Sequence, residues 1–267
     1  MTNPQHENYL DDDLFAKELS RPLHRPNGWL VVGVSRGPAR AAALALAARK
    51  QRLVLVGEEP KFLRDAAAEA KRLGAPQVDL IDNGLDAGPS DAESVLKRTA
   101  ELITIEGLVC GLGGDEARVA PRPVVKILPD RLEQVFNRRV VATLVLLRQV
   151  GEEFATSSRS GIKGKVLLLS SMLGFRAQKG RSSACLVAAW LNSLGQSLAE
   201  EWRRDNIRLT TLCLPAPDER TGNVDLRDDY LSVVERGFKG LKAGRALVFP
   251  SRKLAREARR SERAGGI

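Results

Sequence analysis

Apolar, strand-like runs and helical segments alternate along most of the chain, and this alternation limits its fold more than any other feature. The apolar runs fall at residues 29–34, 52–56, 76–81, 107–110, 164–170 and 207–214. Segments typical of helices lie between them, at 38–50, 60–73, 90–102, 129–154 and 181–205. Strands joined through helices pair in parallel by right-handed crossovers. The pattern therefore predicts a Rossmann-type, doubly wound parallel sheet in a three-layer α/β/α arrangement.

The length of 267 residues suits one large α/β domain with short extensions. We expect an N-terminal arm at 1–28, the α/β domain at 29–250 and a basic tail at 251–267. Residues 239–267 carry nine Lys or Arg and two Glu, a local charge of +7 (9 − 2). A basic tail attracts anionic partners, and a solvated helix end accounts for the same charges equally well.

Histidine and tyrosine are scarce, and this scarcity excludes several kinds of active site. The only histidines are His6 and His24, and the only tyrosines are Tyr9 and Tyr230. Both histidines lie in the predicted arm, so the domain has no histidine base, no Ser-His-Asp triad and no histidine metal site. We therefore expect no metal centre.

The cysteines and the apolar content indicate a cytoplasmic protein. Cys110, Cys185 and Cys213 are far apart in the sequence and are expected to be reduced thiols. The longest apolar run, 140–147, is far too short to span a membrane, and no apolar segment opens the chain as a secretory signal would. Aromatic residues make up 4% of the chain, which argues against a nucleic-acid surface built on stacking.

Several motifs occur in an order and spacing that resemble those of the short-chain dehydrogenase/reductase family. The run VGVSRGPA at 32–39 resembles the family's glycine-rich turn, and LVCGLG at 108–113 stands where the family has a strand followed by NNAG. The runs at 166–171 and 207–215 resemble the strand that carries the catalytic serine and the strand that ends in Pro-Gly. Residues 244–250 are similar to the C-terminal stretch of acyl and ketone reductases in the family. The resemblance covers about residues 28–250.

The resemblance implies a set of catalytic residues that this chain has mostly lost. The family uses a tyrosine, a lysine four residues later on the same helix face, a serine about thirteen residues before the tyrosine, and an asparagine on the preceding long helix. Ser171 matches the serine, whereas Ala184, Ala188 and Arg139 stand at the other three positions. An alignment shifted by two residues gives Asn137 instead of Arg139, on another side of the helix. No Tyr-x-x-x-Lys occurs anywhere in the chain.

The resemblance also implies a nicotinamide dinucleotide site, at Gly33, Arg36, Gly37 and Asp79. Ala39 replaces the third glycine of the turn, and Cys110 and Gly111 replace the paired asparagines. Arg36 suits a 2′-phosphate, whereas Glu58 repels one, so the choice between NAD and NADP stays open. We expect NAD(P) to bind weakly at best and no cofactor to be required.

Two functions compete on these observations. The leading interpretation is a pseudoenzyme, a reductase fold that serves as a scaffold or regulatory subunit and is not an active NAD(P)-dependent oxidoreductase. The alternative is a repurposed enzyme that binds a small molecule in the old cleft and catalyses a cyclisation, dehydration or isomerisation. Its candidate residues are Lys179, Arg181, Asp218, Glu219 and Tyr230, together with Ser171. The basic tail adds a third interpretation, a protein that binds nucleic acid or an acidic surface through the tail.

Both of the long predicted helices carry apolar residues at helical spacing. Val140, Leu144 and Leu147 follow one stripe of the first, and Leu186, Leu194 and Leu198 follow the second, with Ala189 and Trp190 beside them. In the family these helices pack against their counterparts in a second subunit. We therefore expect a homodimer, or a heteromer with a homologue of the same family.

Overall fold

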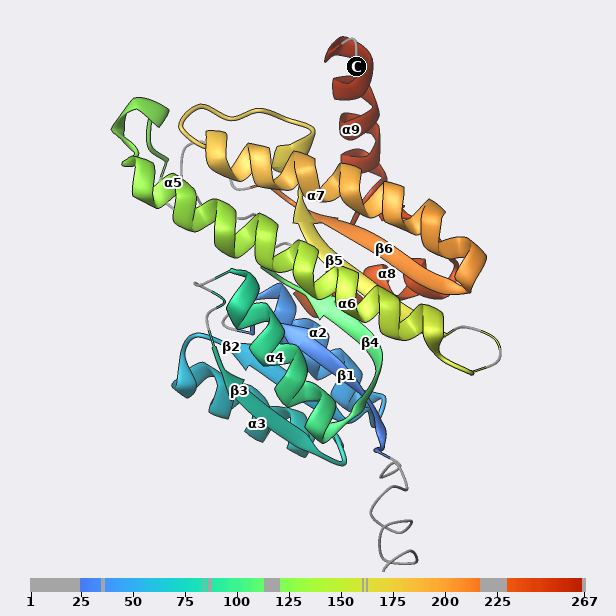
Figure 1. The fold of residues 1–267 in the computed structure, drawn as a ribbon. Helices are drawn as coiled ribbons and strands as arrows, with labels where there is room; N and C mark the ends of the chain where they lie inside the picture. The colour runs from blue at the N-terminus through green and yellow to red at the C-terminus, as the bar shows by residue number, and fades with distance from the viewer. Residues whose placement is uncertain are drawn as a thin grey trace, which may run out of the picture.

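One seven-stranded parallel sheet forms the centre of the protein (Figure 1). The computed structural model describes residues 25–34, 37–83, 85, 88–112, 121–159, 161, 163–216 and 230–265. All neighbouring strands are parallel, and their order is β3-β2-β1-β4-β5-β6-β7. This confirms the predicted Rossmann-type fold. The strands are Asn27–Val32 (β1), Leu53–Gly57 (β2), Val78–Asp82 (β3), Thr104–Cys110 (β4), Gly164–Ser171 (β5), Ile207–Leu214 (β6) and Leu247–Val248 (β7).

Helices cover both faces of the sheet. Figure 1 shows α4, α6 and α7 on the near face, with α2, α3 and α8 behind the strands. Four of the helices have a proline in their first turn, where the missing N–H costs no helical hydrogen bond. The helices are Pro38–Ala48 (α2), Pro60–Arg72 (α3), Pro89–Leu102 (α4), Pro129–Phe136 (α5), Ala142–Thr156 (α6), Ser182–Glu201 (α7), Tyr230–Lys242 (α8) and Arg252–Gly265 (α9).

Alternating side chains along the strands feed two separate apolar layers. Val31 and Leu55 pack with α2, α3 and α8, whereas Leu30 and Val54 pack with α4 and α6 on the opposite face. This division follows from the two-residue period of a strand. Because both faces of the sheet are buried, the strands read as continuous apolar runs in the sequence.

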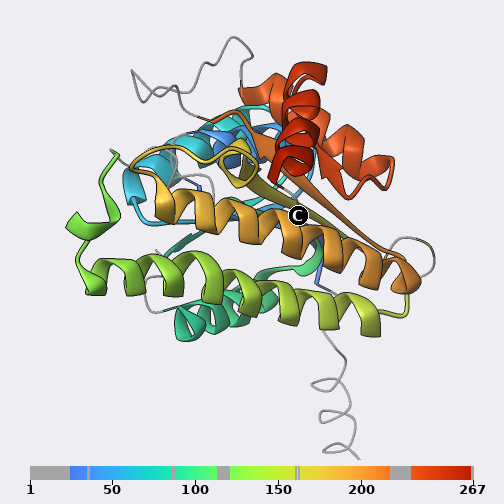
Figure 2. The same ribbon diagram turned by 90° about the horizontal axis from the view of Figure 1, so that it is seen from above.

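The long helix predicted over 129–154 is interrupted in the structure. A π-helical turn at Asn137–Val141 separates α5 from α6, and the chain passes through it without leaving the helix. Figure 2 shows α5 and α6 running beside α7 along one side of the molecule. A π turn inserts one extra residue into a helix and is frequent at functional sites. The apolar periodicity of the segment did not reveal it.

The first strand and the last helix lie close to the predicted boundaries of the α/β domain. The first strand begins at Asn27, inside the predicted arm, while residues 1–24 lie outside the described residues. In the predicted tail, Leu254 and Ala258 of α9 pack against Met172 and Cys213 of the body. The rest of α9 stands away from the sheet (Figure 1). No described helix is long and apolar enough to cross a membrane.

Replacement of Phe154 by alanine should destabilise the fold strongly. The Phe154 side chain is 1% exposed, and its ring lies directly on the backbone of Gly164, where β5 begins. The cavity left by Phe154→Ala should lower the free energy of unfolding by about 3–5 kcal/mol. Phe136→Ala, at a side chain 49% exposed, should cost less than about 1 kcal/mol. Urea unfolding of both variants measures the difference, and equal losses would contradict this account of the core.

Candidate functional site

The turn after β1 keeps the backbone shape of a phosphate-binding turn. Gly33 has a φ of +82° and Gly37 a φ of +120°, conformations that only glycine adopts without strain. The backbone N–H groups of Gly33 and Val34 both donate to the carbonyl oxygen of Val56, at 3.0 and 2.8 Å. Because α2 begins directly after Gly37, its N-terminus lies at the carboxyl edge of the sheet, as anion binding requires. Arg36 lies outside the described residues.

Two departures from the family pattern compensate one another in this turn. A Cβ on Gly111 would lie 2.8 Å from the methyl group of Ala39 and 3.0 Å from the carbonyl oxygen of Val32. The side chain of Ala39 therefore occupies the space that any side chain at position 111 would need. Alanine replaces glycine on the helix, and glycine replaces asparagine after β4, with close packing preserved.

The carboxyl end of β2 has no room for the acidic residue that would bind a ribose at position 57. A Cβ on Gly57 would overlap the carbonyl oxygen of Val34, because the turn after β1 folds onto this strand. The next residue, Glu58, forms an ion pair with Arg138 of the π turn. Burial and the neighbouring charge of Arg139 lower the pKa of Arg138 to about 10. The carboxylate at this edge is therefore already engaged by a cation of the protein.

The acids of β3 lie at different heights along the strand. Asp79 is in register with Val54 and accepts a hydrogen bond from Gln77 at 2.7 Å. Asp82, three residues further on, is in register with Gly57 at the carboxyl edge. The structure thus places Asp82, and not Asp79, beside the end of β2.

Ser171, which the resemblance matches to the family's catalytic serine, is buried at the end of β5. Its Oγ accepts a hydrogen bond from the backbone N–H of Leu173 at 3.2 Å and so begins a short 3-10 turn, Met172–Gly174. The neighbouring Ser170 donates to the carbonyl oxygen of Ala188 at 3.3 Å. Both hydroxyl groups therefore form hydrogen bonds with nearby backbone groups.

An apolar cluster surrounds Ala184 and Ala188, the positions where the resemblance places the family's tyrosine and lysine. Ala184 and Ala188 are 5% and 2% exposed and pack with Leu173, with Cys185 and Ala216 at the edge. They lie four residues apart on one face of α7, as the sequence predicted. None of these side chains carries a hydroxyl or an amine. The cluster therefore offers no phenol to protonate a substrate and no amine to hold a nicotinamide ribose; among its described side chains, only the thiol of Cys185, at the edge, carries an exchangeable proton.

Arg139 lies on the π turn, where the resemblance places an asparagine. Its side chain is buried, and its carbonyl oxygen accepts a hydrogen bond from the Thr143 hydroxyl at 2.7 Å. Thr143 also contacts the Sγ of Cys110 at 3.9 Å. Burial raises the pKa of the Cys110 thiol, while the positive charge of Arg139 opposes that shift. A buried cation thus replaces a neutral amide beside the end of β4.

Asn192 is a structural residue that the sequence analysis overlooked. It is buried on α7, one turn beyond Ala188, and its amide donates to the carbonyl oxygen of Ser171 at 3.5 Å. Its side-chain oxygen, Oδ1, accepts a hydrogen bond from the thiol of Cys213 at 3.3 Å. The signal was present in the sequence, because positions 184, 188 and 192 repeat at helical spacing and only the last is polar.

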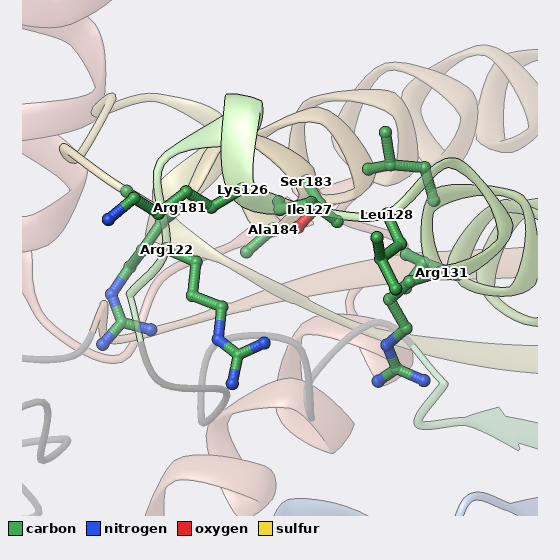
Figure 3. Close-up of a pocket in the computed structure, with 11 residues that line it drawn as sticks. Arg122, Lys126, Ile127, Leu128, Arg131, Arg181, Ser183 and Ala184 are labelled. Atoms are coloured by element: carbon green, nitrogen blue, oxygen red, sulfur yellow. The ribbon is translucent and has the colours of Figure 1, made fainter.

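An open cavity of about 440 Å³ lies beside Ala184, between residues 121–135 and the start of α7 (Figure 3). A hydrogen bond from the Arg122 N–H to the carbonyl oxygen of Gly180, at 2.8 Å, ties its two walls together. The lining includes four cationic side chains and no carboxylate among the described residues: Arg122, Lys126, Arg131 and Arg181. The first three were not predicted, because nothing in the sequence shows that residues 121–135 lie beside α7.

The predicted candidates for a repurposed enzyme do not come together. Arg181 lines the cavity, whereas Lys179 is exposed and lies outside its lining. Tyr230 packs with the apolar layer on the other face of the sheet. Asp218 and Glu219 lie outside the described residues. Among the described residues, no group of three His, Cys, Asp or Glu side chains is arranged to hold a metal ion.

The described residues fit only part of a nicotinamide dinucleotide. The backbone at Gly33 and Gly37 suits a pyrophosphate, since positive φ angles precede a helix N-terminus. The nicotinamide end does not fit, because methyl groups stand at Ala184 and Ala188. No hydride-transfer step can therefore be derived from these residues.

Comparisons with known proteins agree on the family. The family profile described as short chain dehydrogenase matches residues 28–225. A 12alpha-hydroxysteroid dehydrogenase from Clostridium sp. is 25% identical over 219 residues, 80% of each chain. The bulky-bulky ketone specific alcohol dehydrogenase from Comamonas testosteroni superposes with a TM-score of 0.74 at 20% identity, covering 91% of this chain and 93% of that one. A short-chain dehydrogenase from Sphingobium yanoikuyae in complex with NADPH gives 0.71 at 22% identity, covering 90% and 93%. This chain therefore belongs to the short chain dehydrogenase family.

Proposed function

We propose that this chain is a family member that has lost carbonyl reduction and acts as a non-catalytic subunit. Its partner is a second copy of itself, an active homologue or an enzyme of the same pathway. Its free cysteines, two of them buried, support a reducing, cytoplasmic location.

One observation carries the proposal. The two side chains that would donate a proton to the substrate and clamp the cofactor are the methyl groups of Ala184 and Ala188, packed in an apolar cluster. General acid catalysis alone contributes about 10²–10⁴-fold to a rate. The relatives named above are dehydrogenases, so hydride transfer is the activity against which the proposal must be tested.

The cavity beside Ala184 favours the second candidate, a family member that binds a small molecule. Its described lining offers Ser183 as a hydroxyl group but no carboxylate, imidazole, phenol or thiol. A cyclisation, dehydration or isomerisation needs a group that accepts or donates a proton. The described wall therefore supports binding and gives no support to a repurposed reaction.

We further propose that a dinucleotide binds weakly and is not required. The turn at Gly33 and Gly37 supports pyrophosphate binding, and the family relative solved with NADPH makes such a cofactor reasonable. Against tight binding stand the missing clamp at Ala188 and the ion pair between Glu58 and Arg138 at the end of β2.

The exposed face of α6 and α7 supports assembly into a dimer. Leu144 is exposed there and lines a groove of about 380 Å³ together with Leu194, Leu198 and Trp202, and Leu186 is exposed elsewhere on α7. Val140 and Leu147, which share the predicted stripe, are instead buried in the protein. An exposed apolar surface of this kind marks an interaction site, and a two-fold axis would pair it with itself.

Reductase activity should be absent. The purified chain, given NADH or NADPH with ketones, β-ketoacyl thioesters or oxidised hydroxysteroids, should show only the background rate of host enzymes. Gly37→Asp, which disrupts the phosphate turn, is the control and should show the same residual rate. A rate that Gly37→Asp abolishes would establish genuine activity and refute the proposal. The double variant Ala184→Tyr with Ala188→Lys should also stay inactive, because Arg139, Cys110 and Gly111 still depart from the family pattern.

Dinucleotide affinity should be low and limited by charge at the end of β2. Calorimetry with NADH and with NADPH should give Kd values weaker than about 100 μM. Glu58→Gln removes the carboxylate and should favour NADPH over NADH about three- to tenfold, since Arg138 then faces the 2′-phosphate alone. Glu59→Gln, at the adjacent exposed residue, should not change the ratio. Micromolar binding by the unaltered chain would overturn the expectation.

Assembly should depend on the apolar face of α6. Leu144→Glu places a carboxylate on this face and should convert a dimer into a monomer in sedimentation velocity. Leu231→Glu on α8 is the matched control, since both leucines are 41% exposed, and it should remain dimeric. A strict monomer at tens of micromolar, from which no host partner is recovered, would remove the basis for a scaffold role.

A further inference from the structure

The cavity between residues 121–135 and α7 brings four cationic side chains together. Arg122, Lys126 and Arg131 lie on one wall, and Arg181 lies on the other. Among the residues that the structure describes, no carboxylate lies within ion-pair distance of Arg122, Lys126 or Arg131. Clustered like charges repel one another, so an anion bound between them would be stabilised.

The same cavity exposes apolar side chains. Leu128 is 73% exposed and Leu132 37% exposed, and the partly exposed Ile127 lies in the same lining. Each would gain free energy if an apolar group covered it, at roughly 25 cal/mol per Å². The volume of about 440 Å³ falls within the usual range of small-molecule sites.

The backbone holds both walls in place without a ligand. The Arg122 N–H donates to Gly180, and a short 3-10 turn at Val124–Lys126 follows. Gly180 has a φ of +74°, and a Cβ there would lie 3.1 Å from Pro121. Figure 3 shows the guanidinium groups of Arg122, Arg131 and Arg181 pointing to the same side of the site. A preformed site of this kind loses little conformational entropy on binding.

We propose that this cavity binds a small amphipathic anion, with one carboxylate or phosphate group on an apolar chain or ring. Guanidinium groups bind both kinds of oxyanion through paired hydrogen bonds. The leucines beside them would cover the apolar part. The inference does not depend on loss of catalysis or on dimer formation, because no residue that it uses belongs to the α6–α7 groove.

Calorimetry at low ionic strength tests the proposal with three probes of equal chain length: decanoate, decyl phosphate and decanol. The anions should bind at least about tenfold more tightly than decanol, and added salt should weaken them. Comparison of decanoate with decyl phosphate identifies the preferred head group. The double variant Arg122→Gln/Lys126→Gln should lose at least about tenfold in affinity for the anions. Lys71→Gln/Arg72→Gln on α3 removes the same charge far from the cavity and should bind normally.

Leu128→Glu provides a second variant at an exposed side chain, where misfolding is not expected. It adds a negative charge to the site and should weaken both anions at least about tenfold. Equal affinity for decanol and decanoate, binding that the cavity variants leave unchanged, or binding of inorganic phosphate as tight as that of decyl phosphate would each overturn the proposal. Sedimentation and activity assays on the same preparations separate this outcome from failure of the proposed subunit role.

Discussion

Direct backbone contact at the carboxyl edge of the sheet is the constraint on which the rest of the site depends. Three positions there have no room for an ordinary side chain: Gly33 against Gly111, Gly57 against Val34, and Gly111 against Ala39. These contacts pack the turn after β1 and the start of α2 directly against the ends of β2 and β4. They also exclude an acidic side chain from position 57, so the same packing that preserves the phosphate turn alters the adenosine end.

The contacts that hold α7 against the sheet do not depend on the catalytic side chains of the family. Around Ala184 and Ala188, contacts between α7 and the turn after β5 remain tight: a Cβ on Gly174 would lie 2.7 Å from the backbone of Ala188. Asn192 adds hydrogen bonds to Ser171 and Cys213 across β5 and β6. None of these contacts requires a tyrosine or a lysine. A chain with alanine at both positions therefore keeps these contacts, and an apolar cluster lies where the resemblance places the tyrosine and the lysine.

The features of the fold that depend on residues close together in the sequence could be predicted. Apolar runs predicted the parallel sheet, and helical spacing predicted that Ala184 and Ala188 share one buried face of α7. The cavity could not be predicted, because its two walls are joined by a backbone hydrogen bond between Arg122 and Gly180. The amino-acid type at neither position indicates such a bond. The π turn was equally hidden, since its residues, Asn137–Val141, include no glycine or proline that would mark an irregular turn.

The contact between Ala39 and Gly111 also has a historical consequence. If the ancestor carried the family's glycine and asparagine at these positions, the methyl group could be accommodated only after the amide had gone. Once Ala39 was in place, any side chain restored at 111 would collide with it. A single substitution of Gly111 by asparagine would therefore disrupt the packing of the turn as long as Ala39 is present. Packing at this contact would therefore oppose restoration of an asparagine at position 111.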